Sequence, residues 1–281
     1  MSSVLILNIA WQVSVLAIIT IGLAIVFGQL RIMNMAHGEL VMIGAYAPVM
    51  TASLGLPGPA QVIVCLLTVG VTAYLMERLV IRHFYGRPFD SLLATWGLSI
   101  LVREVVELVF GRGYQSVPQP LPGTVSVIGA DYPLYRLVVM VGIAAFFVGL
   151  FLWYRKSRIG TEIKAMVENP KLAEACGINT RRLSSGCFVF GALTAGLAGM
   201  ILAPTIRVEP MMGLDYLIRS FFSLVVGGLG SFEGLFIGVG LIGGSQSLVG
   251  SLLNQTYGYL FILVLSIIFL WLKPNGIYRK S

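Results

Sequence analysis

A polar cluster lies near the start of the chain and consists of Asn34, His37, Gly38 and Glu39. A buried amide, imidazole or carboxylate is costly in lipid unless something uses or satisfies it. These side chains are therefore candidates to contact a solute that crosses a membrane, and Gly38 permits a break in a helix. The alternative is that Glu39 and His37 only tie a loop to neighbouring helices. The pattern leaves both interpretations open.

A second polar seam contains Thr95, Trp96 and Ser99. In a helix, Thr95 and Ser99 lie one turn apart, so their hydroxyls can line a path through a bundle. Trp96 has the alternative and commoner role of an anchor at the membrane interface. The seam is a second candidate for a solute pathway.

Glycines cluster at the end of a short apolar segment, at Gly227, Gly228 and Gly230. Glycine at such a place can free backbone carbonyls and amides for a ligand or a gate. It also allows helices to pack closely, and the spacing fits both roles.

One basic residue, Arg103, falls inside an apolar run. Glu107 lies one helical turn further on and Glu104 lies next to it, so we expect one of them to neutralise the guanidinium within the same helix. We interpret this pair as structural. In a self-powered transporter, Glu39, Glu104 and Glu107 would instead be the proton or ion sites.

Motifs of the common catalytic sites are absent from the sequence. There is no G-x-x-x-x-G-K-[ST] phosphate loop, no H-E-x-x-H and no G-x-S-x-G. With His37 and His83 as the two histidines, we expect neither an enzyme nor a metal site, and no cofactor in this chain. Cys65, Cys176 and Cys187 have no C-x-x-C spacing, so they predict no disulfide framework or zinc site.

The composition is that of a membrane protein. Hydrophobic residues make up 57% of the chain, charged residues 11%, and the mean hydropathy is +0.89. The net charge of +7 comes from short basic clusters between apolar runs, which set orientation in a bilayer and do not predict nucleic-acid binding. The first thirty residues carry no charged side chain, so a cleavable signal peptide is not expected.

A membrane-spanning helix needs about 20 predominantly apolar residues. On that measure we predict an all-α polytopic bundle, a single transmembrane domain over residues 1–281, with eight or nine spans. The second and seventh are short or polar at one end, so either can be broken or re-entrant. The predicted spans are residues 5–28, 36–53, 59–76, 91–110, 136–154, 186–203, 217–229, 234–252 and 257–272.

Basic residues are distributed unequally between the loops. The loops on one side, residues 29–35, 77–90, 155–185 and the tail from residue 273, carry 14 Lys and Arg, against four on the other side. The positive-inside rule then places the N-terminus outside and the C-terminus in the cytosol. The polar cluster at Asn34–Glu39 would lie at the cytosolic edge unless the segment dips inward.

The longest external loop spans residues 111–135 and contains four prolines. The alternating run Thr124–Ile128 predicts a small hairpin. The loop can either meet an external partner or form a rigid cap over the bundle.

The cytosolic loop at residues 155–185 is expected to form two short helices hinged at Asn169-Pro170. Thr161 can cap a first helix with Ile163, Met166 and Val167 on one face. Asn169 can cap a second, with Pro170 in its first turn, Leu172, Ala175 and Cys176 on one face, and Gly177 at its end. Such a compact amphipathic element suits a membrane protein that is pushed by a separate soluble motor. The alternative is an interfacial loop lying on the lipid surface.

These segments resemble the integral-membrane permease subunits of ABC importers for branched-chain amino acids and their urea and amide relatives. Taken together they are specific, although each alone is weak, and they span most of the chain. They are Asn34–Glu39 (NMAHGE), Met42–Tyr46 (MIGAY), Leu93–Gly97 (LATWG), Ala173–Asn179 (AEACGIN) and Val226–Ser231 (VGGLGS).

The resemblance implies a heterodimer with a second permease in a bacterial inner membrane, two cytosolic ATPase subunits that carry ATP and Mg²⁺, and a periplasmic binding protein. Residues 161–179 then look like coupling helices seated in an ATPase cleft. The cargo would be a branched-chain or other hydrophobic amino acid, with urea or a short amide as the alternative. The candidate coupling residues are Glu162, Ile163, Lys164, Met166, Asn169, Pro170, Leu172, Glu174 and Gly177.

We expect transport by alternating access, with ATP hydrolysis in partner subunits. The rival hypotheses are an ion-gradient-driven transporter or channel, and a membrane scaffold without transport. The candidate pathway and gating residues are Asn34, His37, Gly38, Glu39, Tyr46, Thr95, Trp96, Ser99, Gly227, Gly228 and Gly230.

Overall fold

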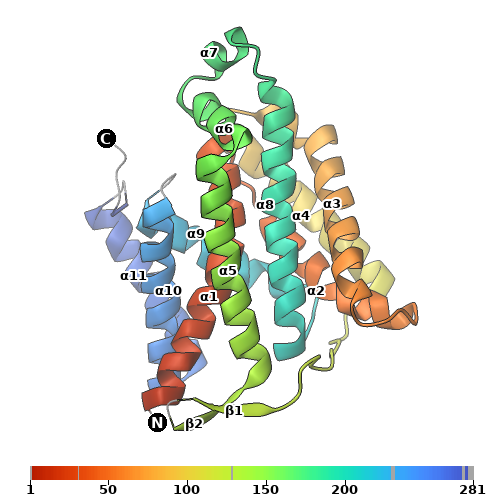
Figure 1. Cartoon of the computed structure of the whole chain (residues 1–281), viewed down its shortest axis with the longest axis vertical. Coiled ribbons are helices and arrows are strands. Elements are labelled where there is room, and N and C mark those ends of the chain that lie inside the picture. The colour runs from red at the N-terminus through yellow and green to blue at the C-terminus, as the bar shows by residue number, and fades with distance from the viewer. Residues whose placement is uncertain (1, 31, 128, 229–231, 274–275, 278–281) are drawn as a thin grey trace.

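The computed structural model describes residues 2–30, 32–127, 129–228, 232–273 and 276–277. Along these residues the chain is a helical bundle with one small hairpin (Figure 1). The elements are α1 (Ser2–Leu30), α2 (His37–Ser53), α3 (Ala60–Leu79), η1 (Ile81–Phe84), α4 (Pro88–Phe110), β1 (Thr124–Val127), β2 (Ala130–Pro133), α5 (Leu134–Lys156), α6 (Arg158–Glu168), α7 (Pro170–Ala175), α8 (Thr180–Leu202), η2 (Ala203–Thr205), α9 (Met212–Gly227), α10 (Phe232–Leu252) and α11 (Gln255–Leu272).

Each of the nine predicted spans coincides with one of these helices, which confirms the all-α polytopic fold. Six helices in the described part of the chain are long and apolar enough to cross a membrane: α1, α3, α5, α8, α10 and α11. Of the other three, α2 and α9 are shorter, with 17 and 16 residues. The third, α4, carries Asp90, Arg103, Glu104 and Glu107.

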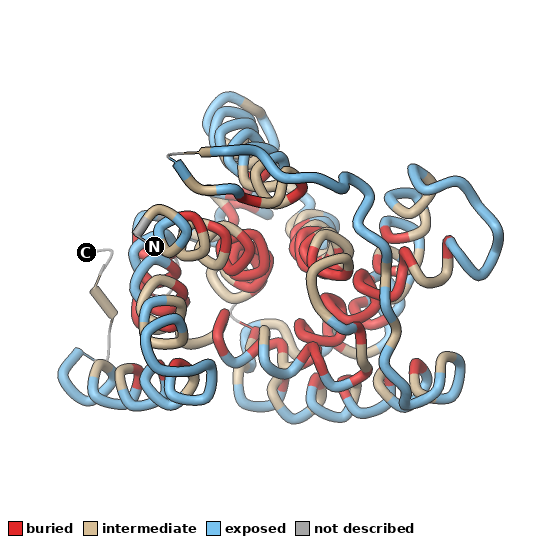
Figure 2. The backbone as a smooth tube through the Cα atoms, turned by 90° about the horizontal axis from the view of Figure 1, so that it is seen from below, coloured by how far each residue is buried: buried red, intermediate tan, exposed pale blue. Residues whose placement is uncertain are grey.

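The centre of the bundle is formed by α1, α2 and α8, and α8 also packs against α3. Figure 2 shows the buried residues gathered in the middle and the exposed ones around the rim. Close approach of the backbones explains the glycines at this centre, because a Cβ on Gly44 of α2 would collide with the carbonyl of Gly196 on α8. Many large apolar side chains of α3, α4 and α5 are exposed, as expected for helices that face lipid.

The chain after α1 turns back into the bundle before α2 begins. His37, the first residue of α2, contacts the carbonyl of Ile19, which lies midway along α1. A Cβ on Gly38 would collide with the carbonyl of Gly213 in the first turn of α9. The polar cluster at the start of α2 therefore dips inward, as a re-entrant segment requires, and the short helices α2 and α9 begin beside each other.

The two ends of the bundle carry different structures (Figure 1). At one end, near the N-terminus, the antiparallel strands β1 and β2 pair Thr124 with Pro133 and Val127 with Ala130, which confirms the predicted hairpin. Ile128, at the end of the predicted alternating run, lies outside the described residues. The opposite end carries α6 and α7, so the hairpin and the predicted coupling segment are separated by the length of the bundle.

The prediction that Thr161 caps the first helix of the coupling segment is wrong. Ser157 is the cap, and its Oγ accepts a hydrogen bond from the Gly160 amide at 3.0 Å. The helix starts earlier than the pattern indicated because Ser157 follows α5 directly with extended backbone angles, φ −83° and ψ 150°. Thr161 lies inside α6.

Candidate functional sites

An ion pair joins the start of α2 to the middle of α4. Glu39 is 2% exposed, and its Oε1 accepts hydrogen bonds from Ser99 Oγ at 2.7 Å and from Arg103 Nη2 at 2.6 Å. The prediction that Glu107 or Glu104 neutralises Arg103 is wrong. The long Arg103 side chain reaches instead across the interface to Glu39, because this deeply buried carboxylate needs a counter-charge most.

Glu107 has a different partner, nearer the end of α4. Its Oε2 accepts a hydrogen bond from Arg112 Nε at 2.7 Å, and Arg112 is an exposed residue of the loop that follows. This hydrogen bond, with the Coulomb attraction of the same carboxylate, raises the pKa of Arg112. Glu104 is exposed.

Hydroxyls on α4 hold the non-helical segment before α2. Ser91 Oγ accepts a hydrogen bond from the Met33 amide at 3.2 Å, and Thr95 Oγ1 accepts one from the Met35 amide at 3.0 Å. Asn34 Oδ1 accepts from the Ala36 amide at 3.1 Å. Irregular backbone inside a membrane protein must find such partners. Thr95 and Ser99 therefore support the re-entrant segment, which is why both are buried.

His37 fixes the depth at which α2 begins. It is fully buried, and its Nε2 lies 3.0 Å from the Ile19 carbonyl, a geometry in which the ring N–H donates to the carbonyl oxygen. The ring thus connects α2 to the middle of α1.

The remaining pathway candidates lie apart from this seam. Tyr46 is buried on α2 and stacks against Phe110 at a centroid distance of 4.7 Å. Trp96 is 56% exposed, so its ring lies away from the buried Thr95 and Ser99 hydroxyls. Gly227 ends α9 against Gly234 of α10, and Gly228 follows with φ +111°. Gly230 lies outside the described residues.

In the predicted coupling segment, α6 is anchored to the bundle. Ile163 and Met166 are buried, and Ile163 joins an apolar cluster with residues of α1 and α10. On the exposed side, Glu162 pairs with Arg158 at 2.9 Å, and Lys164 lies over the Tyr154 ring at 5.0 Å. The apolar stripe of α6 is thus covered by the chain itself.

Helix α7, in contrast, is mostly exposed. Asn169 Oδ1 accepts from the Leu172 amide at 3.1 Å and Pro170 takes the first position, as predicted. Gly177 follows the helix with φ +83°. Leu172 is 61% exposed, whereas Glu174 Oε1 accepts a hydrogen bond from Thr180 Oγ1 at 2.5 Å. The apolar face of α7 projects from the end of the bundle.

A buried carboxylate fastens the chain just beyond α7. Glu77 at the end of α3 accepts hydrogen bonds from Tyr85 at 2.6 Å and from Ser185 of α8 at 2.7 Å. Burial is the main cause that raises the pKa of the Tyr85 phenol, and its hydrogen bond to Glu77 raises this pKa further. Tyr85 is therefore a donor at neutral pH. The start of α8 is therefore held firmly while α7 is not.

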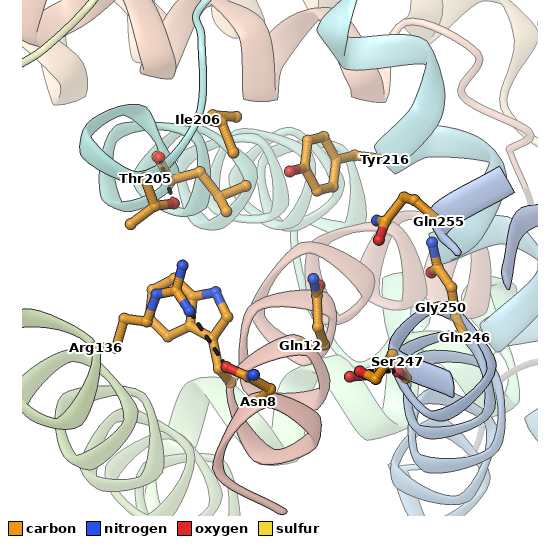
Figure 3. A pocket seen from close by; sticks show the side chains of 13 residues that line it. Asn8, Gln12, Arg136, Thr205, Ile206, Tyr216, Gln246, Ser247, Gly250 and Gln255 are labelled. Atoms are coloured by element: carbon orange, nitrogen blue, oxygen red, sulfur yellow. Dashed lines mark hydrogen bonds between the residues drawn. The ribbon is translucent and has the colours of Figure 1, made fainter. Parts of the chain in front are cut away.

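A cavity of roughly 310 Å³ lies near the hairpin, at the end of the bundle opposite to α6 and α7 (Figure 3). We refer to it as the amide cavity. Its place near the hairpin follows from Asn8, whose Oδ1 accepts a hydrogen bond from Tyr132 of β2 at 3.2 Å. Trp11, Leu202 and Ile206 contribute apolar surface, and Arg136 contributes a cation. Four amide side chains line the cavity: Asn8, Gln12, Gln246 and Gln255.

The amide cavity was not foreseen from the sequence. None of the predicted pathway residues that the structure describes lines it. Gln12 and Gln246, polar residues within otherwise apolar predicted spans, were the available signal. No spacing connects them, because the lining comes from α1, α5, α9, α10, α11 and the segment around η2.

Comparisons with known proteins agree with a membrane transport component. A family model described as branched-chain amino acid transport system / permease component matches residues 5–270. The chain is 29% identical to the high-affinity branched-chain amino acid transport system permease protein LivH of Salmonella typhimurium, over 95% of this chain and 92% of the relative. It is 28% identical to BraD of Pseudomonas aeruginosa over the same shares. No solved structure matches the chain.

Sugar permeases are more distant relatives. The ribose import permease protein RbsC of Haemophilus influenzae is 24% identical over 98% of this chain and 86% of its own length. The relatives are transport permease subunits rather than enzymes. With a bundle of apolar helices and a family match over almost its whole length, the chain belongs to the family of branched-chain amino acid transport system permease components.

Proposed function

We propose that this permease imports branched-chain or other hydrophobic amino acids by alternating access, driven by ATP hydrolysis in separate subunits. The family model for branched-chain amino acid permease components, which matches residues 5–270, supports amino acids as cargo. Urea and short amides are the alternative cargo. The complex would contain a second permease, two ATPases and a periplasmic binding protein.

The observation that carries this proposal is the contrast between α6 and α7. The buried Ile163 and Met166 join α6 to the bundle, whereas Leu172 on α7 is 61% exposed. An ATPase cleft that receives α7 can therefore move α6, and with it the ends of α1 and α5. We assign coupling to Glu162, Ile163, Lys164, Met166, Asn169, Pro170, Leu172, Glu174 and Gly177.

The pathway is proposed to run beside the re-entrant start of α2. Small movements there would change the distance between Gly38 and Gly213, which form the contact between α2 and α9. The seam of Asn34, His37, Glu39, Thr95 and Ser99 would keep α2 attached to α1 and α4 while the bundle rocks. Tyr46, the exposed Trp96 and the glycines Gly227, Gly228 and Gly230 complete the set assigned to the pathway and its gates.

The orientation follows from the distribution of basic residues. With the N-terminus outside and the C-terminus in the cytosol, α6 and α7 face the ATPases, and the hairpin faces the periplasm of a bacterial inner membrane. The amide cavity then lies on the outer side.

Paired carboxylates argue against the ion-gradient alternative. Glu39 is engaged with Arg103, and Glu107 with Arg112. Each of these carboxylates already contacts a guanidinium of the chain, so it is not a free ligand for a transported ion. Glu104 is exposed and is the remaining candidate.

Transport by the reconstituted complex tests the proposal. Proteoliposomes that contain the permease pair, the ATPases and the binding protein would be loaded with ATP or ADP and given labelled leucine or urea. We expect leucine uptake in the proteoliposomes loaded with ATP and none in those loaded with ADP. Gradient-driven uptake by this chain without ATPases, or uptake of urea in preference to leucine, would contradict it.

A further inference from the structure

The amide cavity contains a cation that no carboxylate neutralises. Among the described residues, no Asp or Glu oxygen lies within salt-bridge distance of Arg136. It donates a hydrogen bond to the neutral Asn8 Oδ1 at 3.4 Å, and its guanidinium lies 5.5 Å from the centre of the Trp11 ring and 6.0 Å from that of Tyr132. The residues that line the cavity include no acidic side chain. The cavity is therefore positively charged.

The cavity also contains a buried donor without an acceptor. Gln246 is 6% exposed, and its Nε2 has no hydrogen-bond partner among the described residues. A buried amide N–H that lacks a partner is destabilising. In Figure 3 the amide groups of Gln12, Gln246 and Gln255 surround the same space, with Arg136 on the opposite side. Arg136 and these amide groups therefore face one space from opposite sides, and the Arg136 guanidinium offers the position for an anion.

A second cation lies behind the wall of the cavity. Arg219 is buried between the rings of Tyr216 and Tyr259, at centroid distances of 5.1 and 4.6 Å, and its guanidinium donates to the Tyr259 hydroxyl. No described carboxylate pairs with it. Tyr216 itself lines the cavity. Arg219 thus adds to the positive potential without touching the space.

We propose that the amide cavity binds the α-carboxylate of a small amino acid with an apolar side chain, as a receiving site for cargo on the outer side. This inference rests on the proposed function. The carboxylate pairs with the Arg136 guanidinium, and the amide of Gln246, on the opposite side, lines the space that the rest of the ligand occupies. The hydroxyl of Ser247 and the amide oxygens can accept from the ammonium group, and Trp11, Leu202 and Ile206 contact the side chain.

The dimensions and chemistry favour such a ligand over the cargoes of more distant relatives. A volume of roughly 310 Å³ is at the lower end of the range of about 300–1,000 Å³ for small-molecule sites. A sugar or urea has no anionic group, so it would leave Arg136 without a counter-charge. Charge-assisted hydrogen bonds to a carboxylate are the stronger ones, which makes Arg136 the main determinant of specificity.

Protection of a cysteine in the cavity tests this. Ser251, which lines the cavity and is assigned no contact with the ligand, would be replaced by cysteine in the assembled transporter in membrane vesicles. The exposed Cys176 would be replaced by serine, since Cys65 and Cys187 are buried. A membrane-impermeant thiol reagent then reports access. Leucine at about ten times its dissociation constant should slow labelling by about tenfold. Leucinamide, which lacks the carboxylate, ribose and urea should not.

Variants separate carboxylate recognition from a general change of shape. Arg136→Gln should raise the leucine concentration that gives half-maximal protection by about tenfold or more. Arg136→Lys keeps the positive charge and should raise this concentration less. Gln246→Leu should raise it by a smaller factor. Because removal of an unpartnered buried amide does not weaken the fold, this variant remains informative if Arg136→Gln fails to assemble. Arg207→Gln, an exposed cation over Tyr114, is the control and should change nothing.

Uptake in the same vesicles distinguishes the two proposals. ATP-driven leucine uptake without protection by leucine would overturn the cavity site and leave the proposed function standing. If leucine is not transported, protection is measured with valine, alanine, glutamate and pyruvate. Protection by valine or alanine that disappears in Arg136→Gln supports the proposal. Protection by none of the four, by glutamate or pyruvate only, or by the binding protein alone overturns it.

Discussion

Two buried polar regions of the bundle differ in whether a counter-charge of the chain neutralises their charged side chains. In the seam between α2 and α4, Glu39 and Arg103 lie 2.6 Å apart and neutralise each other. In the amide cavity, Arg136 donates a hydrogen bond to a neutral amide, that of Asn8. A charge that is compensated within the chain holds helices together, whereas an uncompensated charge beside free donors is available to a ligand. The position of a polar residue inside the membrane therefore does not reveal its role; its partner does.

The same distinction separates the two helices of the coupling segment. The apolar stripe of α6 is covered by the bundle, while Leu172 of α7 projects from it. Surface that the chain does not cover is where a partner can bind. Substitutions in the seam and in the coupling segment can therefore test whether internal compensation distinguishes structural residues from binding residues.

Breaking the seam should have the largest effect. Glu39→Leu leaves the Arg103 guanidinium partly buried without a counter-charge, which costs about 3–5 kcal/mol. We expect a strong loss of folded protein in the membrane, measured by size-exclusion chromatography of a fluorescent fusion. The double variant Glu39→Leu/Arg103→Met should recover most of the folded protein, because two apolar residues replace the pair.

The control for this experiment is the other ion pair of α4. Glu107→Gln removes a partner from Arg112, whose side chain is 83% exposed, so the loss of folded protein should be small. Equal losses from Glu39→Leu and Glu107→Gln would mean that burial of the Glu39 pair does not matter for folding.

Removing the exposed apolar contact should impair coupling and leave folding intact. Leu172→Asp places a carboxylate where we propose that an ATPase docks, and loss of an interface anchor costs about 2 kcal/mol or more. ATP-driven leucine uptake should fall by at least about tenfold at unchanged abundance. The matched control is Ile163→Ala, where the buried side chain predicts loss of folded protein. Normal uptake by Leu172→Asp would exclude α7 as a docking element.

The helices could be predicted from sequence because each depends on local information. Apolar runs of membrane length located nine of the helices, alternation located the hairpin, and Asn169, Pro170 and Gly177 marked the limits of α7. The first cap was missed because Ser157 directly follows the basic end of α5 and looks like part of that boundary.

The sites were harder to predict because they depend on distant residues. Arg103 had an acidic neighbour at helical spacing, yet it pairs with Glu39, 64 positions away in the sequence. The amide cavity forms where single polar residues of several helices meet, which no periodicity announces. For Trp96, the sequence could not tell which face of α4 packs inward, and the ring is on the exposed face.

Replacing Gly177, which needs a left-handed backbone but packs against nothing, should give a moderate effect. Gly177 has φ +83°, and a Cβ added there would meet no other part of the fold within 4 Å, so Gly177→Val strains the backbone without a clash. The left-handed conformation costs about 1–2 kcal/mol for a residue with a side chain. We expect the end of α7 to loosen and uptake to fall severalfold. Gly186→Ala on α8, which also has open space but helical angles, should leave uptake unchanged.

The smallest effect should come from the cap of α6, which shows whether the chain itself satisfies the end of this helix. Ser157→Ala removes the acceptor of the Gly160 amide and should cost about 1 kcal/mol, seen as about fivefold faster hydrogen exchange of the first amides of α6. Thr161→Ala should change exchange by much less, because Thr161 lies inside the helix, where its Oγ1 contacts the Ser157 carbonyl at 3.4 Å. A larger effect of Thr161→Ala would mean that α6 of the protein in its membrane begins at Thr161, as the sequence pattern predicted.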